Sequence, residues 1–248
     1  MKIFLLRSLN YIAWSYAYIG LLYALYFIYF IVVPNYREQN QLSNSVYLIF
    51  NIVFLYFFSQ GYLNMILTTF APMSNSDEKK TDRCCDTCLD YTRERSHHCY
   101  LCRTCIPTQD HHCFFVGTCI GKHNQLNFLL MLFHLICAHL IGYGFVCNYL
   151  WNELGGFHFV TILKIFFFNI GYVIGFVKTK WEVFICLHHY LVYFDIGFIS
   201  SLFYHMMKRS LNGQTYYEEK KMILRKKQNF SQIFGSNKLI LIFPFIRP

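Results

Sequence analysis

Long stretches without a charged residue alternate with short polar segments along this chain. Residues 11–33 contain no formal charge, and neither do residues 46–70 or 126–151. At a rise of about 1.5 Å per residue, each stretch is long enough to cross a hydrocarbon core of roughly 30 Å as a helix. The pattern therefore predicts three transmembrane helices in these ranges.

The last third of the chain is also apolar, but it carries isolated charges. Residues 157–177 include Lys164, and residues 181–207 include Glu182, Asp195 and three histidines. If both segments cross the membrane, the chain has five spans, and if only the second crosses, it has four. Hydropathy alone leaves both possibilities open.

The charges at the two ends favour four spans. The predicted tail, residues 208–248, is rich in lysine and arginine, and Lys2 and Arg7 lie near the other end. Positive flanking charge favours the cytoplasmic side, so both ends are expected there, which requires an even number of crossings. We therefore predict residues 181–207 as the fourth span and residues 157–177 as a re-entrant or interfacial segment, with a fifth crossing as the alternative.

The overall composition agrees with this interpretation. Of the 248 residues, 55% are hydrophobic and 14% are charged, a balance closer to an integral membrane protein than to a soluble enzyme. The lipid bilayer is thus the expected environment, and nucleic acid is not an expected partner. No internal repeat or low-complexity tract is evident.

Cysteines are concentrated between the second and third predicted spans. Eight of the eleven lie between Cys84 and Cys119, in a segment that the topology assigns to the reducing cytoplasm. Metal binding is a better expectation there than disulfide formation. We therefore treat residues 84–124 as a separate cytoplasmic unit, here called the Cys-rich domain.

Two zinc sites can be drawn through the Cys-rich domain. Zinc takes four tetrahedral thiolate or imidazole ligands, and a C-x2-C spacing lets two thiolates reach one ion. The first predicted set is Cys85, Cys88, His98 and Cys105, and the second is Cys99, Cys102, His112 and Cys119. Two such sites would supply folding energy that a segment with few apolar residues lacks. Cys84 in place of Cys85, and His97 in place of His98, are the alternatives.

Three neighbouring residues remain outside both sets: Asp110, His111 and Cys113. A thiolate is the reactive form of cysteine, and a free thiol is mostly protonated at neutral pH unless a base or cation lies nearby. His111 could be that base, with Asp110 holding its ring, as in covalent catalysis by other nucleophiles. At a membrane surface, this arrangement suits thioester exchange of a long acyl chain. The alternatives are a supporting role around the metal and a purely structural zinc module.

The run from Cys85 to Phe128 resembles the DHHC protein acyltransferases, or palmitoyltransferases. The shared pattern comprises both predicted zinc sets, the Asp-His-His-Cys run at 110–113, and Arg95, Val116, Gly121, Asn124 and Phe128. In the tail, Thr215 and Glu218 are similar to the ends of the family's Thr-Thr-x-Glu motif, and Asn229 to an asparagine of its C-terminal element. Phe114-Phe115 replaces the usual Pro-Trp and Thr118 the usual asparagine, which indicates a divergent branch.

The resemblance implies a multi-pass enzyme of the Golgi or endoplasmic reticulum membrane with two structural zinc ions. Palmitoyl-CoA would acylate Cys113, activated by His111 and Asp110, and the chain would pass to a cysteine of a substrate protein. A catalytically inactive, membrane-anchored zinc-binding scaffold is the alternative. The predicted fold is an all-α integral membrane protein with four transmembrane helices and a small zinc-stabilised Cys-rich domain between spans two and three.

Overall fold

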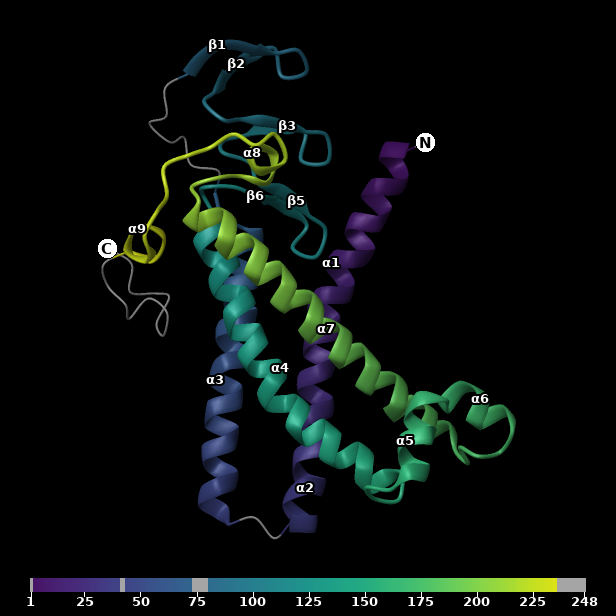
Figure 1. Cartoon of the computed structure of the whole chain (residues 1–248). Coiled ribbons are helices and arrows are strands. Elements are labelled where there is room, and N and C mark those ends of the chain that lie inside the picture. The colour runs from purple at the N-terminus through teal and green to yellow at the C-terminus, as the bar shows by residue number, and fades with distance from the viewer. Residues whose placement is uncertain (1, 41–42, 73–79, 236–248) are drawn as a thin grey trace. The chain divides into compact units, whose positions relative to one another are not determined.

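The computed structural model describes residues 2–40, 43–72 and 80–235 (Figure 1). Residues 236–248 of the predicted tail lie outside this range. The chain divides into two compact units. The first comprises Met1–Leu21, Ser59–His134 and Leu202–Pro248, and the second comprises Leu22–Phe58 and Leu135–Ser201. All of the predicted site residues belong to the first unit.

Four helical stretches are long and apolar enough to span a membrane. The first runs through α1 (Lys2–Phe27), the π-helical turn η1 (Ile28–Val32) and α2 (Val33–Asn40), and the others are α3 (Asn44–Thr69), α4 (Gln125–Glu153) and α7 (Lys180–Leu211). Large apolar side chains such as Ile12, Ile49, Leu140 and Phe194 are exposed on them, as expected of helices that face lipid. The predicted four-helix membrane fold is therefore confirmed.

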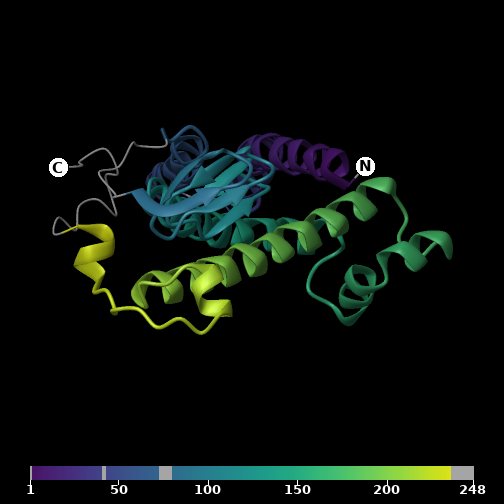
Figure 2. The same cartoon turned by 90° about the horizontal axis from the view of Figure 1, so that it is seen from above.

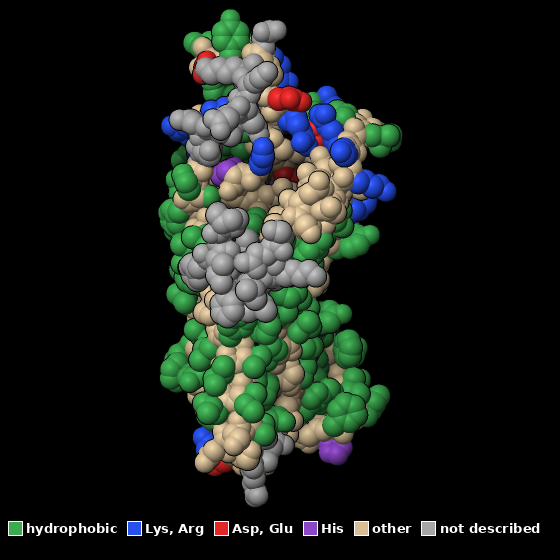
Figure 3. Space-filling model, turned by 90° about the vertical axis from the view of Figure 1, so that its left-hand side faces the viewer, with side chains coloured by type: hydrophobic (Ala, Val, Ile, Leu, Met, Phe, Trp, Pro, Cys, Tyr) green, Lys and Arg blue, Asp and Glu red, His purple; other side chains and the backbone are tan. Residues whose placement is uncertain are grey.

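The surface shows the same division between apolar and charged regions. Hydrophobic side chains are spread over the helices on the face drawn in Figure 3, whereas lysine and arginine side chains gather around the Cys-rich domain and the tail. This is the distribution expected of a membrane-embedded helical part and a part that lies outside the bilayer.

The segment at 157–177 forms two short helices, α5 (Phe159–Phe166) and α6 (Phe168–Val173). At about 1.5 Å per residue, neither reaches half of a hydrocarbon core of roughly 30 Å. Among the described residues, only the four stretches above qualify as candidate spans. The placement of this segment in a re-entrant or interfacial position stays a prediction.

The Cys-rich domain is built from three antiparallel β-hairpins, which lie together in both views (Figures 1 and 2). The first pairs β1 (Lys80–Cys85) with β2 (Asp90–Arg93), the second pairs β3 (His97–Cys99) with β4 (Thr104–Ile106), and the third pairs β5 (His111–Cys113) with β6 (Thr118–Ile120). Strands this short bury little surface, so the hairpins need another source of stability.

The second and third hairpins are copies of one another, so the expectation of a chain without repeats is wrong. Residues 97–106 read HHCYLCRTCI and residues 111–120 read HHCFFVGTCI. The pairing register is the same, because Cys99 faces Thr104 and Cys113 faces Thr118. The repeat is hard to detect from the sequence because it is short and the four central residues differ.

The tail beyond α7 begins with two short helices that are capped by their own side chains. Thr215 and Glu218 form a capping box at the start of α8 (Tyr216–Lys220), and Asn229 and Gln232 form one at the start of α9 (Phe230–Phe234). In a capping box, the two side chains each satisfy a backbone N–H that lacks a helical partner. The three tail residues singled out from the sequence therefore all take part in helix caps.

Candidate functional site

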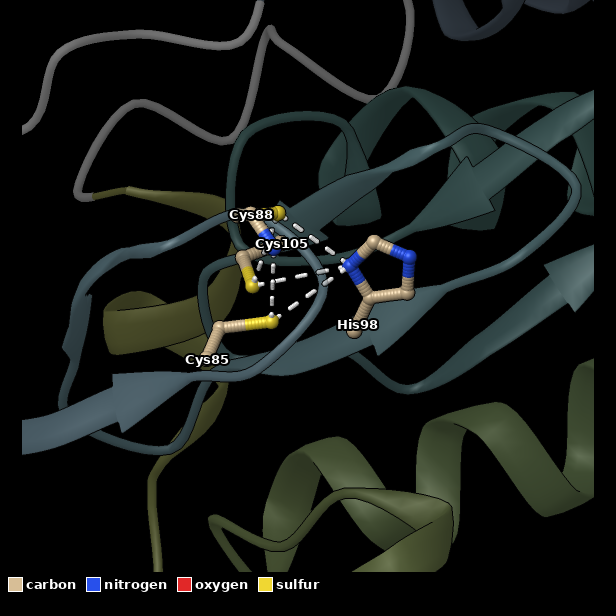
Figure 4. Close-up of side chains that lie close together, drawn as sticks. All are labelled: Cys85, Cys88, His98 and Cys105. Carbon is tan, nitrogen blue, oxygen red and sulfur yellow. Dashed lines mark hydrogen bonds between the residues drawn. The ribbon is translucent and has the colours of Figure 1, made fainter.

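The first predicted zinc set comes together around one point (Figure 4). The ligand atoms of Cys85, Cys88, His98 and Cys105 all lie within 4.8 Å of one another. The sulfurs of Cys88 and Cys105 are 3.7 Å apart, and His98 Nδ1 lies 3.2 Å from the sulfur of Cys88. A tetrahedral zinc ion separates two sulfur ligands by about 3.7 Å and a sulfur and a nitrogen by about 3.5 Å. The first cluster therefore fits zinc.

The second predicted set, Cys99, Cys102, His112 and Cys119, is equally close and more deeply buried. His112 Nδ1 lies 3.5, 3.4 and 3.5 Å from the sulfurs of Cys99, Cys102 and Cys119. The Cys102 and Cys119 sulfurs are 3.6 Å apart. These separations also match a tetrahedral ion.

The hairpin turns bring each C-x2-C pair together. The backbone N–H of Cys88 donates to the sulfur of Cys85, and that of Cys102 to the sulfur of Cys99, both at 3.4 Å. The residue after each pair, Leu89 or Arg103, has a positive φ of 54° or 58°. The turn thus folds back tightly enough for two sulfurs to face one point.

Strand geometry explains why the two clusters interleave in the sequence. Successive side chains of a strand point to opposite faces, and directly opposed residues of two strands share a face. His98 is paired with Cys105 in the second hairpin, and His112 with Cys119 in the third. Each of these pairs supplies two members of one cluster, whereas Cys99, on the other face of β3, belongs to the other cluster.

The two alternative ligands lie outside the first cluster. His97 packs against the ring of Tyr217, with centroids 4.1 Å apart, and the Cys84 thiol is exposed. The geometry thus favours His98 and Cys85 as ligands, and the individual assignments stay a prediction.

Asp110, His111 and Cys113 also come together, outside both clusters. His111 Nδ1 lies 2.7 Å from Asp110 Oδ2, and the His111 ring hydrogen-bonds the Cys113 thiol. Because Asp110 engages Nδ1, the nitrogen left for the thiol is Nε2. His111 and Cys113 stand two residues apart on β5 and so share the face opposite to His112. Adjacent histidines therefore point into two different sites.

The electrostatics of this group favour charged forms. Burial alone would lower the pKa of His111, but hydrogen bonds with Asp110 and Cys113 raise it to about 9. Burial would likewise raise the pKa of Asp110, and hydrogen bonds from His111 and Arg209 outweigh that effect and lower it. An imidazolium beside the Asp110 carboxylate is thus a stable arrangement here.

Arg209, at the C-terminal end of α7, is a site residue that the sequence did not single out. Its Nε and Nη2 atoms donate to Oδ1 and Oδ2 of Asp110 at 3.0 and 2.9 Å. The backbone N–H of Tyr216 donates to Oδ1 at 2.9 Å. Both charged side chains are less than a tenth exposed, and a two-pronged contact of this kind fixes the carboxylate in position as well as in charge. No local signal distinguishes Arg209 from the other cations of the tail.

Glu218 connects the tail to the Cys-rich domain. Its carboxylate accepts a hydrogen bond of 2.8 Å from Arg95, between β2 and β3, and others of 2.7 and 2.9 Å from Arg225. Burial would raise the pKa of Glu218, but Arg95, the backbone of Thr215 and Arg225 together lower it to about 2. The motif predicted from the sequence thus holds α8 against the hairpins.

A polar cavity of about 620 Å³ lies beside Asp110. Lys122, Gln125, Ser210 and Arg225 are among the residues that line it. His111 and Cys113 are not among them. The cavity therefore adjoins the carboxylate of Asp110.

Comparison with known proteins agrees with this geometry. Residues 78–223, more than half of the chain, match the family model of the DHHC palmitoyltransferases. The chain is also 28% identical over 172 residues to a probable protein S-acyltransferase 13 of Arabidopsis thaliana, which covers 65% of this chain and 51% of that protein. The chain thus spans about half the length of this relative. The matched range contains both clusters, the Asp110 group and Glu218, and the chain belongs to the DHHC palmitoyltransferase family.

Proposed function

We propose that this chain is a protein-cysteine S-palmitoyltransferase and that Cys113 carries the acyl group. The observation that carries the proposal is the array of Asp110, His111 and Cys113, which lies outside both metal clusters and in which Asp110 and Cys113 are buried. Family membership supports the same activity. A nucleophile, a base and a residue that orients the base are the parts that a thioester exchange requires.

The first half of the reaction forms an acyl-enzyme. His111 takes the proton of Cys113, and Asp110 stabilises the resulting imidazolium. The thiolate attacks the thioester carbonyl of palmitoyl-CoA, a new bond forms between this carbon and the Cys113 sulfur, and the bond to the coenzyme A sulfur breaks. Coenzyme A leaves as a thiol after it takes the proton from His111.

The second half passes the chain to a substrate protein. The thiol of a substrate cysteine gives its proton to His111 and attacks the acyl carbonyl on Cys113. The bond to the Cys113 sulfur breaks, and Cys113 leaves as a thiolate that regains the proton from His111. Thioesters are exchanged for thioesters in both halves, so no further energy source is needed.

The remaining parts of the chain have supporting roles in this proposal. The two clusters would hold structural zinc ions, which supply folding energy to hairpins that bury little surface. Arg209 keeps Asp110 charged and in place. The four apolar helices make the chain a multi-pass membrane protein. A cytoplasmic Cys-rich domain in the Golgi or endoplasmic reticulum membrane would meet both the acyl donor and the substrate cysteines.

The proposal is tested with purified, zinc-loaded protein and labelled palmitoyl-CoA. We expect a hydroxylamine-sensitive adduct that is lost in Cys113→Ser. Cys84→Ser is the matched control, because Cys84 is exposed and outside both clusters, and it should keep the adduct. Both variants should retain two zinc ions. A protein that retains two zinc ions but forms no adduct would instead be the inactive zinc-binding scaffold.

A further inference from the structure

One face of α1 lies against the hairpin that carries Cys113. The contacts come from Asn10, Trp14 and Tyr18, which are spaced four residues apart and so lie above one another on a helix. All three belong to the same compact unit as the hairpin. They also lie outside residues 78–223, the range that matches the family model.

Asn10 touches the second cluster from outside. Its Oδ1 lies 3.0 Å from Nε2 of His112, the ring nitrogen that faces away from the three cysteine sulfurs. An amide oxygen only accepts hydrogen bonds, so the contact places the proton on Nε2 and leaves the Nδ1 lone pair directed at the sulfurs. A hydrogen bond of this kind orients a metal-binding histidine and sets its tautomer.

Trp14 packs against the turn between β5 and β6. A Cβ atom added to Gly117 would lie 2.9 Å from Cδ1 of Trp14, a distance that real Cβ atoms do not adopt. Gly117 has a φ of +70°, but Arg103 adopts a φ of 58° at the equivalent position of the second hairpin. The close approach of the indole ring, more than the backbone conformation, therefore requires glycine here.

Tyr18 reaches the same turn through Thr69, the last residue of α3. The hydroxyls of Tyr18 and Thr69 are 2.8 Å apart, and Thr69 Oγ1 donates to the carbonyl of Val116 at 2.9 Å. Since a carbonyl only accepts, Thr69 must donate its proton to Val116 and accept from Tyr18. The relay thus runs from α1 to the turn that follows Cys113.

We propose that Asn10, Trp14 and Tyr18 are positioning residues that hold the third hairpin from outside the Cys-rich domain. Asn10 keeps His112 in its metal-binding tautomer, and Trp14 and Tyr18 hold Gly117 and Val116, four and three residues after the thiol. The effect on acyl transfer rests on the proposed function, whereas the effect on metal retention does not.

The metal arm measures zinc release to a coloured chelator, 4-(2-pyridylazo)resorcinol. We expect one of the two ions to leave at least about tenfold faster from Asn10→Ala than from the unmodified protein, the usual size of such an effect. Asn10→Asp keeps an acceptor oxygen and should restore slow release. Leu9→Ala is the control, since its side chain is exposed on the same helix, and it should leave release unchanged. Equal release from Asn10→Ala and the unmodified protein would overturn the role of Asn10.

The packing arm is a double-mutant cycle on the rate of Cys113 acylation. We expect Gly117→Ala to slow acylation and Trp14→Ala to restore part of the loss in the double variant, because the clash is then removed. Additive effects of the two substitutions would contradict a direct contact. If no variant forms an adduct, the proposed function fails while the zinc-release result still stands. If adducts form but neither zinc release nor the double-mutant cycle shows an effect, the positioning role of Asn10, Trp14 and Tyr18 fails while the proposed function stands.

Discussion

The second and third hairpins share one backbone and differ in what their cysteines do. In the second hairpin, Cys99 and Cys102 form a C-x2-C pair, and both sulfurs join the second cluster. In the third, Val116 stands where Cys102 stands, fully buried, and Cys113 remains outside the clusters. The position occupied by Cys102 or Val116 thus decides whether the hairpin offers a C-x2-C pair, and it is one of four positions at which the two hairpins differ.

The neighbouring histidines differ in the same way. His97 and His111 are equivalent in the repeat, but His97 packs against Tyr217, whereas His111 pairs with Asp110 and the Cys113 thiol. The hairpin sets the direction of each side chain, and the partners beyond the hairpin decide its chemistry. The comparison teaches that the carboxylate and its arginine, rather than the strand itself, distinguish the candidate active site.

The most disruptive change would place a cysteine three residues after Cys113, as Cys102 follows Cys99. In Val116→Cys, two thiols at C-x2-C spacing should form a disulfide with oxidised glutathione, which is reduced to two glutathione molecules. We expect acylation to be abolished by this treatment and recovered with dithiothreitol. Val116→Ala loses similar packing without a second thiol, so oxidised glutathione can only form a mixed disulfide that leaves one glutathione on Cys113. Intact-mass measurement should therefore find glutathione bound to Val116→Ala, whereas Val116→Cys should lose two hydrogens and carry none. Glutathione retained on Cys113 in both variants would contradict the equivalence of the hairpins.

Replacing each of the two equivalent histidines by glutamine tests the roles of their partners. We expect His111→Gln to slow acylation of Cys113 by about 1,000-fold, within the range for loss of a general base. His97→Gln should change the rate by less than about threefold, since its contact with Tyr217 is a packing contact. Single-turnover acylation with labelled palmitoyl-CoA measures both rates. Comparable losses in the two variants would remove the distinction between His97 and His111.

Removing the arginine behind Asp110 should have a smaller effect. Arg209→Ala leaves a buried carboxylate without its two-pronged partner, and a misplaced orienting group costs about 100-fold in rate. Arg209→Lys restores the charge but not the fork, so an intermediate loss is expected. The maximal acylation rate should fall while the palmitoyl-CoA concentration at half-maximal rate stays constant. A change in that concentration alone would show that Arg209 serves substrate binding instead.

The smallest effect is expected at the flank of the thiol. Phe115 is 37% exposed in the turn of the third hairpin. Phe115→Trp introduces the residue that DHHC palmitoyltransferases usually have at this position. We expect the rate of Cys113 acylation to change by less than about threefold, as is typical of substitutions at a partly exposed site. A gain of 100-fold or more would mean that the altered flank impairs this chain.

Local spacing carried most of what the sequence predicted. Uncharged runs of sufficient length predicted three of the four long helices, and the charges at the two ends favoured residues 181–207 as the fourth. C-x2-C spacing and the four-ligand requirement of zinc predicted which cysteines and histidines come together. Arg209 lies 99 residues from Asp110, and Asn10 lies 102 residues from His112. Contacts over such separations depend on tertiary packing, which no local pattern encodes. The repeat is faint in the sequence because its four central residues differ.

The claim that the third hairpin presents a nucleophile, and the second a metal ligand, is tested most directly by mapping the acylated cysteine. Zinc-loaded protein would be incubated with palmitoyl-CoA, digested, and analysed by mass spectrometry for all eleven cysteines. We predict one hydroxylamine-sensitive palmitoyl group, on Cys113, and none on Cys99. Acylation of Cys99, or an adduct that persists elsewhere in Cys113→Ser, would contradict the claim.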